Sequence, residues 1–204
     1  MINILLDKLQ QKKAVIGIVG LGYVGLPLVQ RYLEEGFVVV GFDIDPQKIS
    51  KLATGKPYIE HIDSAPFLAA INNKTFLATS DFTTIKTVDA IILCVPTPLN
   101  KNREPDLSFV TGSLKNIIPH MHPGQVVSLE STTYPGTTEE KMLPPIMEAG
   151  YTVGTDTFLI YSPEREDPAN PDFTTKTIPK VVGGTTPNCM EVGQALYENI
   201  IDVV

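Results

Sequence analysis

The feature that most constrains the fold is a glycine pattern near the start of the chain. Gly20, Gly22 and Gly25 follow an apolar run at 14–20 that is typical of a buried strand, and a helix-like run at 24–35 comes directly after it. In such a strand–turn–helix unit, the first glycine permits a tight turn and the second lets the backbone approach a pyrophosphate. The third glycine lets the helix pack closely on the strand. The pattern therefore predicts a dinucleotide-binding turn.

A carboxylate at the end of the next apolar run, 37–43, strengthens this prediction. Asp43 stands where a side chain accepts hydrogen bonds from the adenosine ribose hydroxyls and repels a 2′-phosphate, so NAD is favoured over NADP. The helix N-terminus offers N–H groups and a partial positive charge to the pyrophosphate. Tyr23 and Val24 lie within this turn and complete the predicted cofactor-binding residues around the glycines.

Short β-rich runs alternate with helix-like stretches along the rest of the chain. Runs such as 90–95 are continuously apolar, as in strands buried on both faces of a parallel sheet. We therefore expect an α/β fold, namely a Rossmann-type doubly wound, mostly parallel sheet with helices on both faces. The expected strands are 14–20, 37–43, 75–78, 89–95, 125–129, 158–161, 180–182 and 201–204, and the expected helices lie near 2–9, 24–35, 46–53, 63–72, 107–118, 138–149 and 187–199.

Composition and charge argue against several other classes of protein. The formal net charge of −7 disfavours sequence-independent nucleic-acid binding, which needs a basic surface. No apolar run approaches the ~20 residues that span a bilayer, and the first residues lack the basic region of a secretory signal. We expect a cytoplasmic protein that binds neither nucleic acid nor membrane.

The cysteines and histidines do not form a recognisable metal site. Cys94 lies inside an apolar run and is predicted to be a small buried hydrophobe, and Cys189 is predicted to be structural in the first turn of a helix. His120 and His122 are flanked by prolines and have no third ligand nearby, which favours a surface turn over a metal centre. No metal is therefore expected.

Several further segments carry a family resemblance. Together with the glycine turn, they resemble in order the amino-terminal NAD-binding domain of UDP-glucose/UDP-mannuronate-type dehydrogenases. The segments are 20–28, 43–45, 95–99, 104–108, 130–137 and 162–168. The last of them, Ser-Pro-Glu-Arg-Glu-Asp-Pro, is most similar to the branch that oxidises UDP-N-acetylhexosamines, UDP-N-acetylglucosamine in particular.

The resemblance implies an activity and a domain organisation. Enzymes of this family oxidise the C6 alcohol of a UDP-sugar to a carboxylate in two hydride transfers, using two NAD+. Residues 1–204 would be the amino-terminal NAD-binding domain of a longer enzyme, with a central helix and a carboxyl-terminal UDP-binding domain beyond them. The nucleophilic cysteine and its partner lysine would also lie beyond residue 204, and the full-length enzyme would be a homodimer.

The resemblance also assigns roles to individual residues. Thr97 would lie beside the NAD, Ser131 near the nicotinamide, and Thr132 would orient the catalytic water. Glu164 would assist proton transfer and hydrolysis of the thioester intermediate, although such a residue can also be a solvated loop acid. Arg165 would contact the substrate, or it would pair with neighbouring acids at the surface.

Two other functions stay open at this point. One is a free-standing NAD-binding module without chemistry, against which the segment 198–204 argues because it resembles the middle of a strand. The other is a 3-hydroxyacid dehydrogenase of the 6-phosphogluconate type, which has a similar amino-terminal fold. Those enzymes do not resemble this chain at 130–137 or 162–168.

Overall fold

The computed structural model describes residues 1–60, 62–101, 103–163 and 177–204, and within them seven strands form one sheet. Its strand order is β3-β2-β1-β4-β5-β6-β7, with every neighbouring pair parallel except β6 and β7. The strands are β1 Val15–Val19, β2 Val38–Phe42, β3 Phe76–Thr79, β4 Ala90–Leu93, β5 Gln125–Leu129, β6 Thr157–Tyr161 and β7 Gly183–Gly184. The order reverses between β1 and β4, which is where doubly wound sheets bind ligands. The expected fold class is confirmed.

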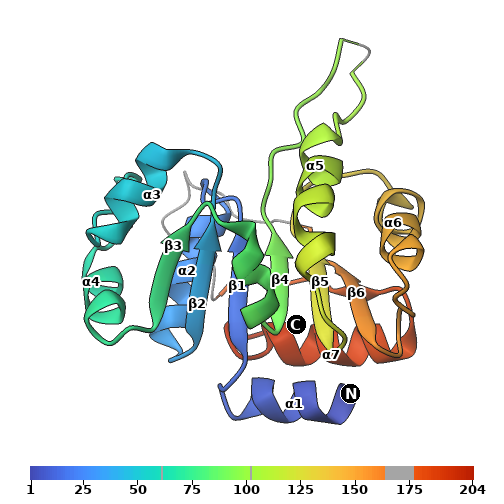
Figure 1. Ribbon diagram of the computed structural model, residues 1–204, viewed down its shortest axis with the longest axis horizontal. Coiled ribbons are helices and arrows are strands. Elements are labelled where there is room, and N and C mark those ends of the chain that lie inside the picture. The colour runs from blue at the N-terminus through green and yellow to red at the C-terminus, as the bar shows by residue number, and fades with distance from the viewer. Residues whose placement is uncertain (61, 102, 164–176) are drawn as a thin grey trace.

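Helices cover both faces of this sheet (Figure 1). The α-helices are α1 Ile2–Gln10, α2 Gly25–Glu34, α3 Pro46–Ala53, α4 Ala65–Asn72, α5 Ser108–Ile117, α6 Leu143–Glu148 and α7 Pro187–Tyr197. Because successive side chains of a strand point to opposite faces, Ile16 and Ile18 of β1 join a core with α2 and α7, while Val19 joins a second core with α5. None of the helices in the described part of the chain combines the length and the apolarity that a membrane crossing requires.

Local chemistry explains where several helices begin and end. The side chain of Asp45 caps α3 by accepting from the N–H of Gln47, and the side chain of Thr186 caps α7 by accepting from the N–H of Cys189. A proline follows each of these caps, where its missing N–H costs nothing. Gly36, at φ +89°, takes the chain out of α2 in a conformation that favours glycine.

The secondary structure differs from the prediction in two regions. The strands expected at 180–182 and 201–204 are wrong, because the last strand is β7 and 201–204 lies outside any strand. The two apolar runs meet through a backbone hydrogen bond of 2.9 Å from Lys180 to Val203 without forming a ladder. The helix expected over 138–149 is divided into a π-helical turn, η3 Thr138–Met142, and α6, whose first turn contains prolines that cannot donate hydrogen bonds.

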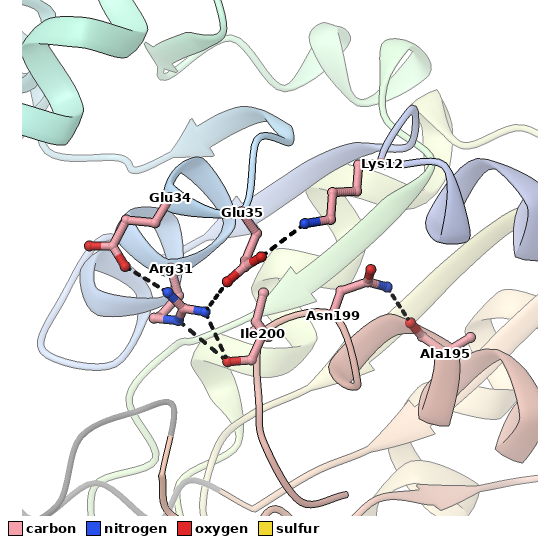
Figure 2. Close-up of polar contacts among 7 residues, drawn as sticks. All are labelled: Lys12, Arg31, Glu34, Glu35, Ala195, Asn199 and Ile200. Atoms are coloured by element: carbon pink, nitrogen blue, oxygen red, sulfur yellow. Dashed lines mark hydrogen bonds and ion pairs between the residues drawn. The ribbon is translucent and has the colours of Figure 1, made fainter.

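Arg31 links α2 to distant segments of the chain (Figure 2). Its guanidinium donates to Glu34 at 2.7 Å, to Glu35 at 2.6 Å and, at 3.3 and 3.4 Å, to the carbonyl of Ile200. Lys12 donates to the other oxygen of Glu35 at 2.9 Å, and the hydrogen bonds from Lys12 and Arg31 lower the pKa of the Glu35 carboxyl. This network fixes the carboxyl end of α2 against the segments before β1 and after α7.

Candidate functional site

A pocket of about 710 Å³ lies at the carboxyl ends of β1, β2, β4 and β5. It is lined by Val19, Gly20, Gly22, Tyr23, Val24, Phe42, Asp43, Ile44, Lys48, Phe82, Cys94, Val95, Pro96, Thr97, Ser108, Phe109, Gly112, Ser113, Asn116, Glu130, Ser131 and Thr132. Its size is in the range of small-molecule sites, and its place matches the ligand crevice of an open α/β sheet.

The glycine turn forms one wall of this pocket, and its three glycines meet different constraints. A Cβ at Gly20 would lie 2.5 Å from the carbonyl oxygen of Cys94, and one at Gly25 would lie 1.9 Å from the carbonyl oxygen of Gly20. A Cβ at Gly22 would meet no protein atom within 4 Å. Packing therefore requires glycine at the first and third positions, whereas Gly22 leaves its backbone open for a ligand to approach.

The amino end of α2 presents its N–H groups without competition from a side-chain cap. Val24 occupies the N-cap position, and its side chain makes no capping hydrogen bond. The N–H of Leu26 donates to the carbonyl of Gly22 at 3.0 Å and Pro27 has no N–H, so the N–H groups that suit a pyrophosphate are those at the very start of α2, next to a glycine that admits close approach. Tyr23, which is 68% exposed, borders the same opening.

Asp43 lies at the end of β2 with only 7% of its surface exposed. Its Oδ2 accepts from the N–H of Leu21 at 2.9 Å and from the ammonium of Lys48 at 2.9 Å. Its Oδ1 accepts from the N–H of Asp45 at 3.0 Å and keeps a further lone pair for a ligand. The carboxylate is therefore held in one orientation beside the glycine turn, as recognition of a ribose requires.

Lys48 is a pocket residue that the sequence analysis missed. It stands in the first half of α3, and its position five residues after Asp43 was the available signal. The ammonium also lies 5.9 Å from the ring centre of Tyr58, whose hydroxyl donates to the carbonyl of Leu21. Burial, followed by the negative charge of Asp43, raises the pKa of the Tyr58 hydroxyl, so this residue stays neutral and holds the turn in place.

Apolar side chains form the part of the pocket next to Asp43. The rings of Phe42 and Phe82 stack with centroids 5.6 Å apart, and the exposed side chains of Ile44 and Phe109 lie at the rim. Flat apolar walls beside a ribose-binding acid suit the planar base of a nucleotide. The sequence analysis did not identify these residues, because their neighbourhood depends on how α5 and the 3₁₀ helix Phe82–Thr87 pack beside the end of β2.

The predicted residues Thr97, Ser131 and Thr132 line the opposite end of the pocket. Ser131 Oγ donates to the carbonyl of Val95 at 2.5 Å, and Thr97 Oγ1 donates to the carbonyl of Thr132 at 2.6 Å. The two hydroxyls therefore join the loop after β4 to the loop after β5. Each hydroxyl donates its hydrogen to a backbone carbonyl, whereas its oxygen can still accept a hydrogen bond from a ligand.

The structure brings most of the predicted site residues together. Gly25 lies behind the pocket wall, at the start of α2, and the other predicted residues of the described ranges line the pocket. Glu164 and Arg165 lie outside the described residues. Both cysteines are buried as expected, and Cys189 Sγ accepts from the N–H of Leu159 at 3.3 Å.

The fold and the pocket define a class of protein. The topology around β1 and β4, the glycine turn into α2 and the buried Asp43 at the end of β2 are those of a dinucleotide-binding Rossmann domain, and the acid favours NAD. Residues 14–201 match the UDP-glucose/GDP-mannose dehydrogenase family, NAD binding domain, and the chain belongs to this family. The match argues against the alternative of a 6-phosphogluconate-type dehydrogenase.

Similar proteins carry related names. The chain is 35% identical to a UDP-N-acetyl-D-glucosamine 6-dehydrogenase of Pseudomonas aeruginosa, over 93% of this chain and 44% of that protein. It is 31% identical to a UDP-N-acetyl-D-mannosamine dehydrogenase of Escherichia coli (strain K12), over 93% of this chain and 46% of that protein. The structure of the UDP-N-acetyl-mannosamine dehydrogenase Cap5O from Staphylococcus aureus superimposes with a TM-score of 0.86 at 30% identity, covering 93% of this chain and 46% of Cap5O. The chain thus spans less than half the length of these relatives.

Proposed function

We propose that this chain is the cofactor-binding part of an enzyme that oxidises the C6 alcohol of a UDP-sugar to a uronic acid. The observation that carries the proposal is the NAD-type pocket around Asp43 and Gly22, in a chain that matches a UDP-N-acetyl-D-glucosamine 6-dehydrogenase over 93% of its length. UDP-N-acetylglucosamine is the proposed substrate, because the sugar named for that relative agrees with the resemblance of the segment 162–168.

The stoichiometry of the proposed reaction determines which groups the protein must bind and position. Oxidation of a primary alcohol to a carboxylate consumes one water and two NAD+, and it releases two NADH and three protons. NAD+, when bound, supplies the hydride acceptor. The chain's own part is to hold the adenosine ribose at Asp43, to leave room for the pyrophosphate at Gly22, and to shape the nicotinamide end with Thr97 and Ser131.

Two steps require groups that act on water and protons. We assign Thr132, at the pocket end opposite Asp43, to orient the water, and Glu164 to assist proton transfer and the hydrolysis step. Arg165 is assigned to the substrate. The remaining parts of the enzyme are proposed to supply a nucleophilic cysteine, a UDP-binding domain and a homodimer contact. We further propose a cytoplasmic enzyme of polysaccharide biosynthesis.

The experiment is to express the complete reading frame that contains this chain and to count the NADH released per molecule of UDP-sugar. We expect two NADH per sugar, with UDP-N-acetylglucosamine preferred over UDP-glucose. The 204-residue chain, measured in parallel, should bind NADH without sustained turnover. The proposal fails if no UDP-sugar is oxidised, as expected for a non-catalytic NAD-binding module, or if only one NADH is released per sugar.

A further inference from the structure

A buried ion pair stands directly behind the nicotinamide end of the pocket. Lys180 Nζ lies 2.8 Å from Glu130 Oε2, and the two side chains are 7% and 0% exposed. The residues are 50 positions apart in the chain. Glu130 follows β5 and immediately precedes Ser131 and Thr132, whereas Lys180 stands shortly before β7. The pair therefore connects the loop that carries two predicted site residues to the segment leading into the last strand.

Neighbouring side chains hold this pair in a fixed place. The ammonium of Lys180 lies 5.0 Å from the ring centre of Tyr197 in α7, and the Tyr197 hydroxyl lies 2.7 Å from Ser128 Oγ in β5. Burial, and then the charge of Glu130, raises the pKa of Tyr197 well above its ordinary value, so the phenol stays neutral. Lys180 is thus fixed between β5 and α7, and it has little freedom to release Glu130.

Stability alone is a poor explanation for this arrangement. Removing two charges from water is costly, and an apolar pair of similar volume often stabilises a fold equally well or better. The protein also has a more exposed ion pair away from the pocket lining, between Lys8 and Asp89 at 2.6 Å, with side chains 44% and 12% exposed; Asp89 directly precedes β4. Neither of its residues lines the pocket, so it serves as a reference for the loss of an ion-paired lysine elsewhere in the fold.

The position of Glu130 in the pocket wall indicates a role for the ion pair. Glu130, Ser131 and Thr132 all line the pocket at the end opposite Asp43. The loop they form is joined to the loop after β4 through the hydroxyls of Ser131 and Thr97. We infer that Lys180 is a positioning residue, which through Glu130 sets the wall that receives the nicotinamide half of NAD. This inference depends on cofactor binding by the domain and is independent of the proposed sugar oxidation.

The test compares two ligands that differ only in the nicotinamide. NADH and ADP-ribose are titrated calorimetrically into the chain with Lys180→Met and with Lys8→Met. We expect Lys180→Met to weaken NADH binding ~10-fold or more while ADP-ribose binding changes less than about twofold. Lys8→Met should leave both affinities unchanged. If Lys180 had only a structural role, Lys180→Met would weaken the binding of NADH and of ADP-ribose to the same extent. That result would overturn the inference, and so would unchanged affinity for both ligands.

A second variant covers the possibility that a lone buried carboxylate prevents folding. In Glu130→Gln combined with Lys180→Met, neither charge remains, so a folded chain is expected, as verified by thermal melting. The double variant should show the same selective loss of NADH affinity, because the wall has lost its anchor. Wild-type affinity for NADH in the folded double variant would contradict the positioning role.

Discussion

Lys48 Nζ and the backbone N–H of Leu21 each lie 2.9 Å from the same oxygen of Asp43. One carboxylate thus joins the glycine turn, the end of β2 and the start of α3 at the adenosine end of the pocket. A cation and a backbone N–H hold this oxygen, and they orient the other oxygen of the carboxylate for a ligand.

Asp43→Asn should weaken the preference for NAD. The amide replaces a charged acceptor and no longer repels a 2′-phosphate, so NADH affinity should fall ~10-fold or more while the NADH-to-NADPH affinity ratio decreases. The control is Asp45→Asn, which removes a charge two residues away and keeps the cap on Gln47, since asparagine caps helices as well as aspartate. Titration of both cofactors gives the ratio, and an unchanged ratio in Asp43→Asn would contradict the assigned role.

Alanine should affect stability at Gly25 but hardly at Gly22, although both glycines belong to the same turn. At Gly25 the new Cβ meets a carbonyl oxygen at 1.9 Å, so the free energy of unfolding should fall by about 1–3 kcal/mol or more. At Gly22 nothing lies within 4 Å, so the change should stay below about 0.5 kcal/mol while NADH binding is lost. Urea unfolding and NADH titration of both variants distinguish these effects. A Gly22→Ala variant that binds NADH normally would show that the ligand does not approach there.

Glu35→Gln should lower stability in a pH-dependent way. Hydrogen bonds from Lys12 and Arg31 lower the pKa of the Glu35 carboxyl in the folded protein. The contribution of Glu35 to the free energy of unfolding is therefore fully present above the ordinary glutamate pKa, and it is lost as the pH falls through the lowered pKa of the folded protein. At pH 7 the loss should be about 0.5–1 kcal/mol, because the pairs are partly exposed. Below about pH 4 the difference from wild type should shrink. Thermal melts across this pH range measure the difference, and Glu148→Gln, at an exposed position, is the control. A stability difference between Glu35→Gln and wild type that stays constant with pH would contradict this prediction.

Two buried serines, Ser128 in β5 and Ser162 directly after β6, should respond differently to alanine. Ser128 is hydrogen-bonded to Tyr197 at 2.7 Å, whereas Ser162 Oγ, fully buried, has no hydrogen-bond partner in the structure as described. Ser128→Ala should cost about 1 kcal/mol or more, and Ser162→Ala should be neutral or stabilising by up to about 1 kcal/mol. Denaturant unfolding provides both values. A large loss in Ser162→Ala would indicate a contact outside the described residues.

The sequence was sufficient to predict those parts of the site whose residues lie close together along the chain. The glycines and Asp43 could be identified because one strand–turn–helix–strand unit contains them all. Lys48 and Phe109 were missed because their place in the pocket depends on how α3 and α5 pack. The same holds for Lys180, whose partner Glu130 is 50 residues away and whose segment was wrongly expected to be a strand.

The most direct test of NAD binding in this pocket is a calorimetric titration of the 204-residue chain with NADH and, separately, with NADPH. The structure predicts one-to-one binding of NADH, at least ~10-fold tighter than NADPH, because the held carboxylate of Asp43 repels a 2′-phosphate. Absence of saturable NADH binding, or equal affinity for the two cofactors, would contradict this assignment.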